Sequence, residues 1–106
     1  MSKVTQPWRA ELPSPLEELI LRMLVQHTKM YGLEMVEASD GQLKRGTIYV
    51  TLQRMEKKGF VKSEQEPQLP GATGLPRRLY SIDAPGVKAL DMCARAEEGF
   101  GGKVLA

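Results

Sequence analysis

Apolar side chains recur with helical spacing between residues 15 and 26. Five of them follow the i, i+3, i+4, i+7, i+8 order of one helix face: Leu16, Leu19, Ile20, Met23 and Leu24. Ser14 precedes Pro15, and Glu17 stands three positions after the serine, which is the pattern of a capping box with proline in the first turn. The pattern predicts an amphipathic helix over residues 15–26.

The apolar pattern stops in the segment HTKMYG and resumes in a shorter stretch. There Leu33 and Val36, with Met35 beside them, predict a second helix over residues 32–39. The aspartate and glycine that follow favour a turn, because both tolerate positive φ. We therefore expect this helix to end at that pair.

A third stripe begins after Thr47, which can cap or open a helix. Its apolar residues recur at i, i+4 and i+7: Ile48, Leu52 and Met55. Gly59 follows two lysines and fits the left-handed position beyond a helix C-terminus, so the pattern predicts a helix over residues 47–58. On a helical wheel the apolar residues cluster within about 60°. The opposite half holds Val50, Gln53, Arg54 and Lys57.

Two strands and a last helix complete the pattern. Residues 60–66 and 77–83 alternate and predict an antiparallel hairpin, because residues 67–76 hold three prolines and two glycines and can only form a turn or loop. A final helix is expected over residues 85–98, with Val87, Leu90 and Ala94 on one face, until Gly99, Gly101 and Gly102 break it.

Three helices followed by a hairpin is the order of a winged helix-turn-helix, in which the third helix enters the DNA major groove and the hairpin is the wing. The expected fold is therefore α+β and mainly α, with three helices, a two-stranded wing and a C-terminal dimerisation helix. A chain of 106 residues suffices for one modest core. We expect residues 1–83 to form the DNA-binding domain and residues 84–106 the dimerisation segment.

Positive charge is concentrated in the middle of the chain. Residues 42–78 hold eight Lys and Arg against three acids, a net of +5, whereas the other 69 residues hold seven against ten, a net of −3. A positive patch attracts a polyanion over long range. The basic middle therefore favours a face that binds nucleic acid, and a merely solvated surface is the alternative.

Composition and motifs argue against several other classes. No apolar run approaches the ~20 residues of a membrane span. The first fifteen residues lack the apolar region of a secretory signal and Cys93 is the single cysteine, so we expect a cytoplasmic protein. The chain has no CxxC, HExxH, P-loop or nucleophile-elbow pattern, so we expect no enzyme activity, no metal site and no cofactor.

The third helix supplies the candidate DNA contacts. Gln53 can offer a donor and an acceptor to an adenine edge, and Arg54 can bind guanine through two hydrogen bonds, so these are the candidate base-reading residues. Lys44, Arg45 and Thr47 lie around the helix N-terminus, where the dipole and free N–H groups favour an anion. We assign these three to phosphate.

Four further residues each keep two interpretations. Tyr49 can donate its hydroxyl to a phosphate, or its ring can pack against the wing. Lys57 lies late in the helix, where a solvated charge is favoured over a DNA contact. Arg77 and Arg78 are neighbours in a strand and point to opposite faces, so we expect at most one of them to enter a minor groove or touch the DNA backbone. The alternative is a strand-edge charge that discourages aggregation.

Three stretches together resemble the PadR family of bacterial transcriptional regulators: YGLEMVEA, RGTIYVTLQRMEKKGFVKSE and PRRLYSIDAPGVKAL. That family has a YG opening to its second helix, a Gly-Thr-Leu-Tyr-Pro-x-Leu recognition helix ending in a Leu-Glu-x-x-Gly run, and an Arg-Arg-x-Tyr-x-Leu strand. The matching residues, within residues 14–90, are Gly46, Thr47, Tyr49, Leu52, Glu56, Gly59, Arg78 and Tyr80. Two features depart from the family: Val50 stands where proline is usual, and the tail after Leu90 is short and interrupted by glycines.

The resemblance implies a sequence-specific transcriptional regulator, a repressor that binds double-stranded DNA at an inverted-repeat operator as a homodimer. The expected dimer interface lies on the first and last helices, through Leu16, Val87, Leu90 and Ala94. The rival interpretation is a winged-helix module that binds an acidic protein partner and has no specific DNA site.

Some relatives in the family bind flat aromatic compounds between the terminal helices of the dimer. Trp8 and Phe100 lie outside the predicted core stripes, and with Met23 they would line such an effector pocket. The favoured alternative is that Trp8 packs on the partner subunit as an interface anchor.

Overall fold

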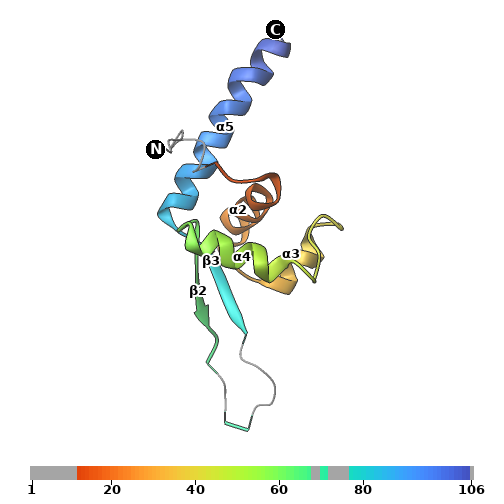
Figure 1. Ribbon diagram of the computed structural model, residues 1–106, viewed down its shortest axis with the longest axis vertical. Coiled ribbons are helices and arrows are strands. Elements are labelled where there is room, and N and C mark those ends of the chain that lie inside the picture. The colour runs from red at the N-terminus through yellow and green to blue at the C-terminus, as the bar shows by residue number, and fades with distance from the viewer. Residues whose placement is uncertain (1–11, 68–69, 72–76, 106) are drawn as a thin grey trace, which may run out of the picture.

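The structure is a computed structural model that describes residues 12–67, 70–71 and 77–105, with residues 97–105 as backbone only. Its elements in chain order are α2 (Pro15–His27), β1 (Lys29–Tyr31), α3 (Gly32–Ala38), α4 (Ile48–Lys57), β2 (Val61–Gln65), β3 (Arg78–Ile82) and α5 (Ala84–Leu105). In Figure 1, α2, α3 and α4 group at the centre, β2 and β3 run away from them in one direction, and α5 runs away in the other. The α+β, mainly α winged-helix fold is therefore confirmed.

The capping box at the start of α2 is present as predicted. The Ser14 hydroxyl accepts a hydrogen bond from the Glu17 N–H at 3.3 Å, and the Ser14 N–H donates to Glu17 Oε1 at 2.9 Å. The buried face is wider than the predicted stripe, because Leu21 is fully buried while Leu16 is 39% exposed. This shift follows from α2 contacting both α5 and the sheet, which covers a broader arc than one neighbour would.

Glu17 also joins α2 to the end of α4. Its carboxylate is 1% exposed, and the Lys58 ammonium donates to both of its oxygens at 3.1 Å. Removing one partner of a fully buried pair costs about 3–5 kcal/mol, and less is expected here because the Lys58 side chain is 35% exposed. One carboxylate therefore caps one helix and fixes the C-terminus of another.

The buried face of α4 is the one that the sequence predicts, since Ile48, Leu52 and Met55 are each at most 1% exposed. The helix ends in a Schellman motif: the Phe60 N–H donates to the Met55 carbonyl at 2.9 Å, and the Gly59 N–H donates to the Glu56 carbonyl at 3.0 Å. The φ of Gly59 is 82°, which is the left-handed conformation expected of it. Thr47 occupies the N-cap position, but its side chain forms no capping hydrogen bond.

The sheet has three strands in the order β1-β3-β2, both pairs antiparallel, which is one strand more than the sequence predicts. The missed strand, β1, pairs Met30 with Tyr80 of β3, and both side chains are buried. Three residues are too few to show strand alternation, and their hydrogen-bond partners lie about fifty positions away in the chain. The core lies between this sheet and the helices α2, α3 and α4. In α3, the Met35 side chain is buried in this core, whereas Leu33 is 40% exposed.

The predicted end of the last helix was wrong, because α5 continues through Gly99, Gly101 and Gly102 to Leu105. A glycine costs a helix about 1 kcal/mol relative to alanine, which weakens it without ending it. Near its start α5 packs closely on the chain: a Cβ at Gly86 would lie 2.2 Å from the Phe60 carbonyl oxygen. Ala89, one turn on, is 2% exposed. None of the helices among the described residues is long and apolar enough to cross a membrane.

The contact at Gly86 predicts that Gly86→Ala destabilises the protein. The new methyl group collides with a backbone oxygen that cannot rotate away, so α5 must shift and the free energy of unfolding should fall by about 1–3 kcal/mol. Gly46→Ala is the matched control, since a Cβ there meets nothing within 4 Å. Urea unfolding of both variants checks this, and an equal effect of the two substitutions would contradict it.

Candidate nucleic-acid interface

One side of α4 faces away from the core. We call it the outward face of α4, and it consists of Val50, Gln53, Arg54 and Lys57. All four side chains are exposed. The buried stripe on the other side of the helix fixes this orientation, because rolling α4 would expose three apolar side chains to water. The structure thus confirms which residues of this helix point outward.

The loop before α4 adds further polar groups beside its N-terminus. Lys44, Arg45 and Thr47 are exposed, as a phosphate-binding role requires. The loop is held to the helix by its backbone, since the Ile48 N–H donates to the Lys44 carbonyl at 3.0 Å. Leu43 is buried next to these basic residues and anchors the loop in the core.

Within the described part of the chain, the polar side chains of this region have no hydrogen-bond or ion-pair partner: Lys44, Arg45, Gln53, Arg54 and Lys57. Several cations elsewhere are paired. Lys29 contacts Glu64 at 2.8 Å, and Arg95 contacts Asp91 at 2.9 Å. The outward face of α4 and the loop before it therefore carry positive side chains and an amide side chain that no other described residue neutralises or hydrogen-bonds.

Tyr49 lies beside this face and packs on α3. A Cβ at Gly32 would lie 2.7 Å from the Tyr49 ring, so the ring rests against the start of α3. The tyrosine is 48% exposed and lines a groove of about 670 Å³ with Tyr31, Leu33 and the two wing arginines. The Tyr49 ring thus packs against α3, and the wing arginines lie on the other side of the groove.

The two wing arginines are each held by residues of the sheet. Arg77 lies just before β3, with its guanidinium 4.2 Å from the centre of the Tyr31 ring and its Nε 3.2 Å from Glu66. Arg78 donates from Nε to the Ser63 hydroxyl at 3.2 Å. The Tyr31 partner was not expected from the sequence, because Tyr31 lies far from the arginines along the chain, whereas Glu66 faces Arg77 across the predicted hairpin.

Tyr31 and Glu66 interact as well. The Glu66 carboxylate raises the pKa of the Tyr31 hydroxyl above its ordinary value, chiefly by accepting its hydrogen bond, while the positive charge of Arg77 opposes that shift. The hydroxyl therefore stays protonated through the neutral pH range and remains a donor. Arg77, Tyr31 and Glu66 form one cluster at the base of the loop that connects the two wing strands, which we call the wing-base cluster.

The residues expected at the dimer interface are placed unequally. Leu16, Val87 and Ala94 are exposed, whereas Leu90 is partly buried and packs against the core. The expected effector pocket stays a prediction: Met23 lies in the core and is 7% exposed, and Trp8 and the Phe100 side chain lie outside the described residues. The described side chains neither support nor contradict that pocket.

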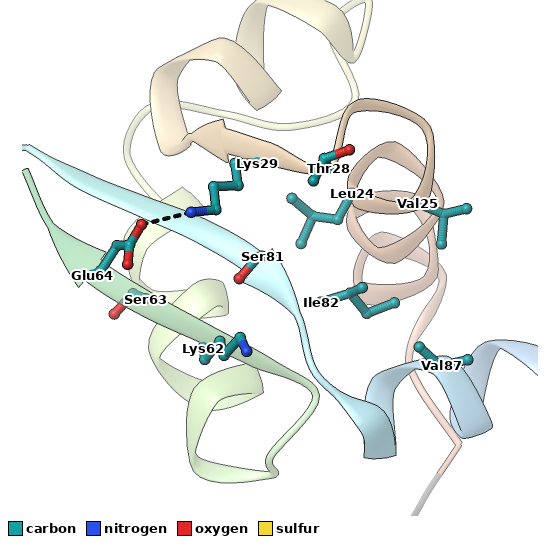
Figure 2. Close-up of a pocket in the computed structure, with 10 residues that line it drawn as sticks. All are labelled: Leu24, Val25, Thr28, Lys29, Lys62, Ser63, Glu64, Ser81, Ile82 and Val87. Carbon is teal, nitrogen blue, oxygen red and sulfur yellow. Dashed lines mark hydrogen bonds and ion pairs between the residues drawn. The ribbon is translucent and has the colours of Figure 1, made fainter.

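A separate groove of about 690 Å³ lies between the end of α2, the sheet and the start of α5. Figure 2 shows Val25 and Val87 at one side of the groove and the Lys29–Glu64 ion pair at the other, with Leu24 and Ile82 between the valines and the ion pair. No group of three or more metal-ligating side chains occurs among the described residues. Neither groove thus brings together the ligand set of a metal site.

Comparison with known proteins identifies the family of this chain. The sequence profile of the transcriptional regulator PadR-like family matches residues 20–92, which is more than half of the chain. The chain belongs to the PadR-like family. The resemblance drawn from the sequence is therefore confirmed. A search of curated proteins found no significant match.

Solved structures of transcriptional regulators share the fold. A PadR family transcription regulator from Clostridium difficile R20291 is 28% identical, with a TM-score of 0.67 over 87% of this chain and 95% of that one. The protein TA0346 from Thermoplasma acidophilum is 31% identical, with a TM-score of 0.65 over 85% and 86%. PadR from Bacillus subtilis, solved in complex with operator DNA, is 22% identical, with a TM-score of 0.63 over 76% of this chain and 46% of that one.

The wing-base cluster predicts an effect of Glu66 on DNA binding. Glu66→Gln keeps the shape of the side chain and removes the charge that holds Arg77, so the freed guanidinium should raise the affinity for any duplex by about twofold to fivefold. Fluorescence anisotropy with random duplex DNA at fixed salt measures this.

The matched control is Glu64→Gln, which removes a carboxylate from the same wing but one that pairs with Lys29. A gain for Glu66→Gln no larger than that for Glu64→Gln would mean that the released Arg77 does not meet DNA.

Proposed function

We propose that this protein is a sequence-specific DNA-binding repressor that binds an inverted-repeat operator as a homodimer. The observation that carries the proposal is the outward face of α4, whose polar side chains have no partner among the described residues. A side chain that is already paired must break that pair before it can bind DNA. The side chains on this face are free of that cost.

The chemistry of the face suits a major groove. Gln53 and Arg54 are consecutive in the helix and lie toward opposite edges of this face. Their side chains match adenine and guanine edges respectively. Lys44 and Arg45 flank the helix N-terminus and suit phosphates, which position a helix without reading sequence. Base reading and backbone anchoring are thus divided between the helix and the loop before it.

Family membership supports the proposal. The PadR-like profile describes transcriptional regulators, and the Bacillus subtilis PadR structure contains operator DNA. That chain is more than twice as long as the part of it that this chain matches, so its DNA complex supports a shared binding mode for the winged helix alone. A repressor blocks a promoter by occupying it, which needs no further domain.

The shape of α5 supports a dimer. The helix has 22 residues, which at 1.5 Å per residue is about 33 Å, and Figure 1 shows its C-terminal half extending beyond the other described helices. A lone helix of this kind is marginal in water, and three glycines weaken it further. A second copy packing along Val87 and Ala94, and along Leu16 at the start of α2, would supply further contacts, since all three side chains are exposed.

Two substitutions separate base reading from phosphate binding. Arg54→Ala should weaken binding to the operator by about 1–3 kcal/mol and relax the preference at one base pair, because it removes a base contact. Lys44→Ala should weaken binding to every duplex alike and lower the slope of affinity against salt by about two, one for each subunit of the dimer.

These affinities are measured by anisotropy on the operator and on a shuffled duplex, over a series of salt concentrations. Equal losses on both duplexes for Arg54→Ala would rule out base reading by that residue. An unchanged salt slope for Lys44→Ala would rule out a phosphate contact by Lys44.

The dimer predicts a sedimentation result. The protein at micromolar concentration should sediment with twice the 11.8 kDa mass of the chain, and Val87→Asp should shift it toward the monomer because a carboxylate would be buried without a partner. Lys88→Asp is the control on the same helix, since Lys88 is exposed and lies outside the proposed interface. A wild-type monomer, both free and on DNA, would contradict the proposed assembly.

A further inference from the structure

Val50 is the apolar member of the outward face of α4, whose other residues are polar. It is 57% exposed, although it lies on the same helix as three fully or almost fully buried apolar residues. Scattered exposed valines are ordinary on protein surfaces, and Val25 at 58% is another. Position and neighbours therefore decide whether Val50 has a role.

The position is the centre of the outward face of α4. At 100° per residue, Val50 lies within about 15° of the direction opposite the buried stripe, and Gln53 and Arg54 lie about 50° to either side. Lys57 shares its direction but lies about 10 Å further along the helix. Val50 thus stands between the two candidate base-reading side chains, in the N-terminal part of the helix, where recognition helices contact base edges.

The chemistry of a major groove gives such a residue one apolar partner. Adenine, guanine and cytosine carry no methyl group there, whereas thymine presents its C5-methyl group beside its hydrogen-bonding oxygen. A valine cannot hydrogen-bond to a base edge, so its favourable contact is with that methyl group. A polar edge at the same place would lose its water and gain no partner.

We propose that Val50 reads a thymine in each half-site by contact with the C5-methyl group. The inference rests on the proposed function, since it requires that α4 lie in a major groove. It adds a specificity-determining residue beside Gln53 and Arg54, and it predicts that the bound sequence contains a thymine that neither of them selects by hydrogen bonding.

Deoxyuridine substitution tests the contact, because deoxyuridine differs from thymidine only in lacking that methyl group. Each thymine of the operator is replaced in turn, and affinities are measured by anisotropy for the wild type and for Val50→Ala. At one thymine per half-site the wild type should bind about threefold to fourfold more weakly, the loss expected for one buried methyl group. Val50→Ala removes the contact in both half-sites of the dimer, so it should bind the thymine operator about ninefold to sixteenfold more weakly, and its affinity should change less than twofold when deoxyuridine is introduced there.

Val25→Ala is the matched control, an equally exposed valine on α2, and it should keep the full deoxyuridine effect of the wild type. If no thymine gives a larger loss for the wild type than for Val50→Ala, the contact is absent and the inference is overturned. Failure of the proposed function gives a different result, because the wild type would then bind operator and shuffled duplex equally.

Discussion

The corner at residues 58–60 holds four elements together. The Lys58 ammonium binds the buried Glu17 carboxylate of α2, and the Phe60 N–H closes the end of α4 on the Met55 carbonyl. The Phe60 carbonyl accepts a hydrogen bond from the Asp83 N–H at 2.9 Å, and Gly86 of α5 packs against the same group. The positions of α2, α4, β2 and α5 therefore depend on three consecutive residues.

This corner fixes one end of α4, and the apolar stripe fixes its rotation. Burying Ile48, Leu52 and Met55 contributes about 1.5–3 kcal/mol each, so the helix cannot turn its polar side inward. The helix is therefore fixed in position and rotation, and the polar side chains of its outward face have no partner among the described residues. Packing on the opposite side of the same helix preorganises the backbone that carries the side chains suited to DNA, which lowers the entropy that this backbone loses on binding.

The sequence predicted local features well and distant ones poorly. Periodicity placed α2 and α4 within a residue or two, and the capping box and Gly59 marked their ends, because these signals lie within a few residues of each other. The strand β1 was missed, since its pairing partner is β3, far along the chain. The contact of Tyr31 with Arg77 was missed for the same reason, whereas Glu66 faces Arg77 across the predicted hairpin. The extent of α5 was misjudged because each glycine costs a helix only about 1 kcal/mol relative to alanine, which weakens the helix without ending it.

The central claim is that the outward face of α4 binds DNA with sequence specificity. Selection of bound duplexes from random DNA tests it most directly, because the operator sequence need not be known beforehand. An inverted repeat whose half-site centres lie about 34 Å apart should be enriched, and it should be bound at least about a thousandfold more tightly than a shuffled duplex at physiological salt. Recovery of no common sequence, with equal affinity for all duplexes, would contradict the account and favour a winged helix that binds another kind of partner.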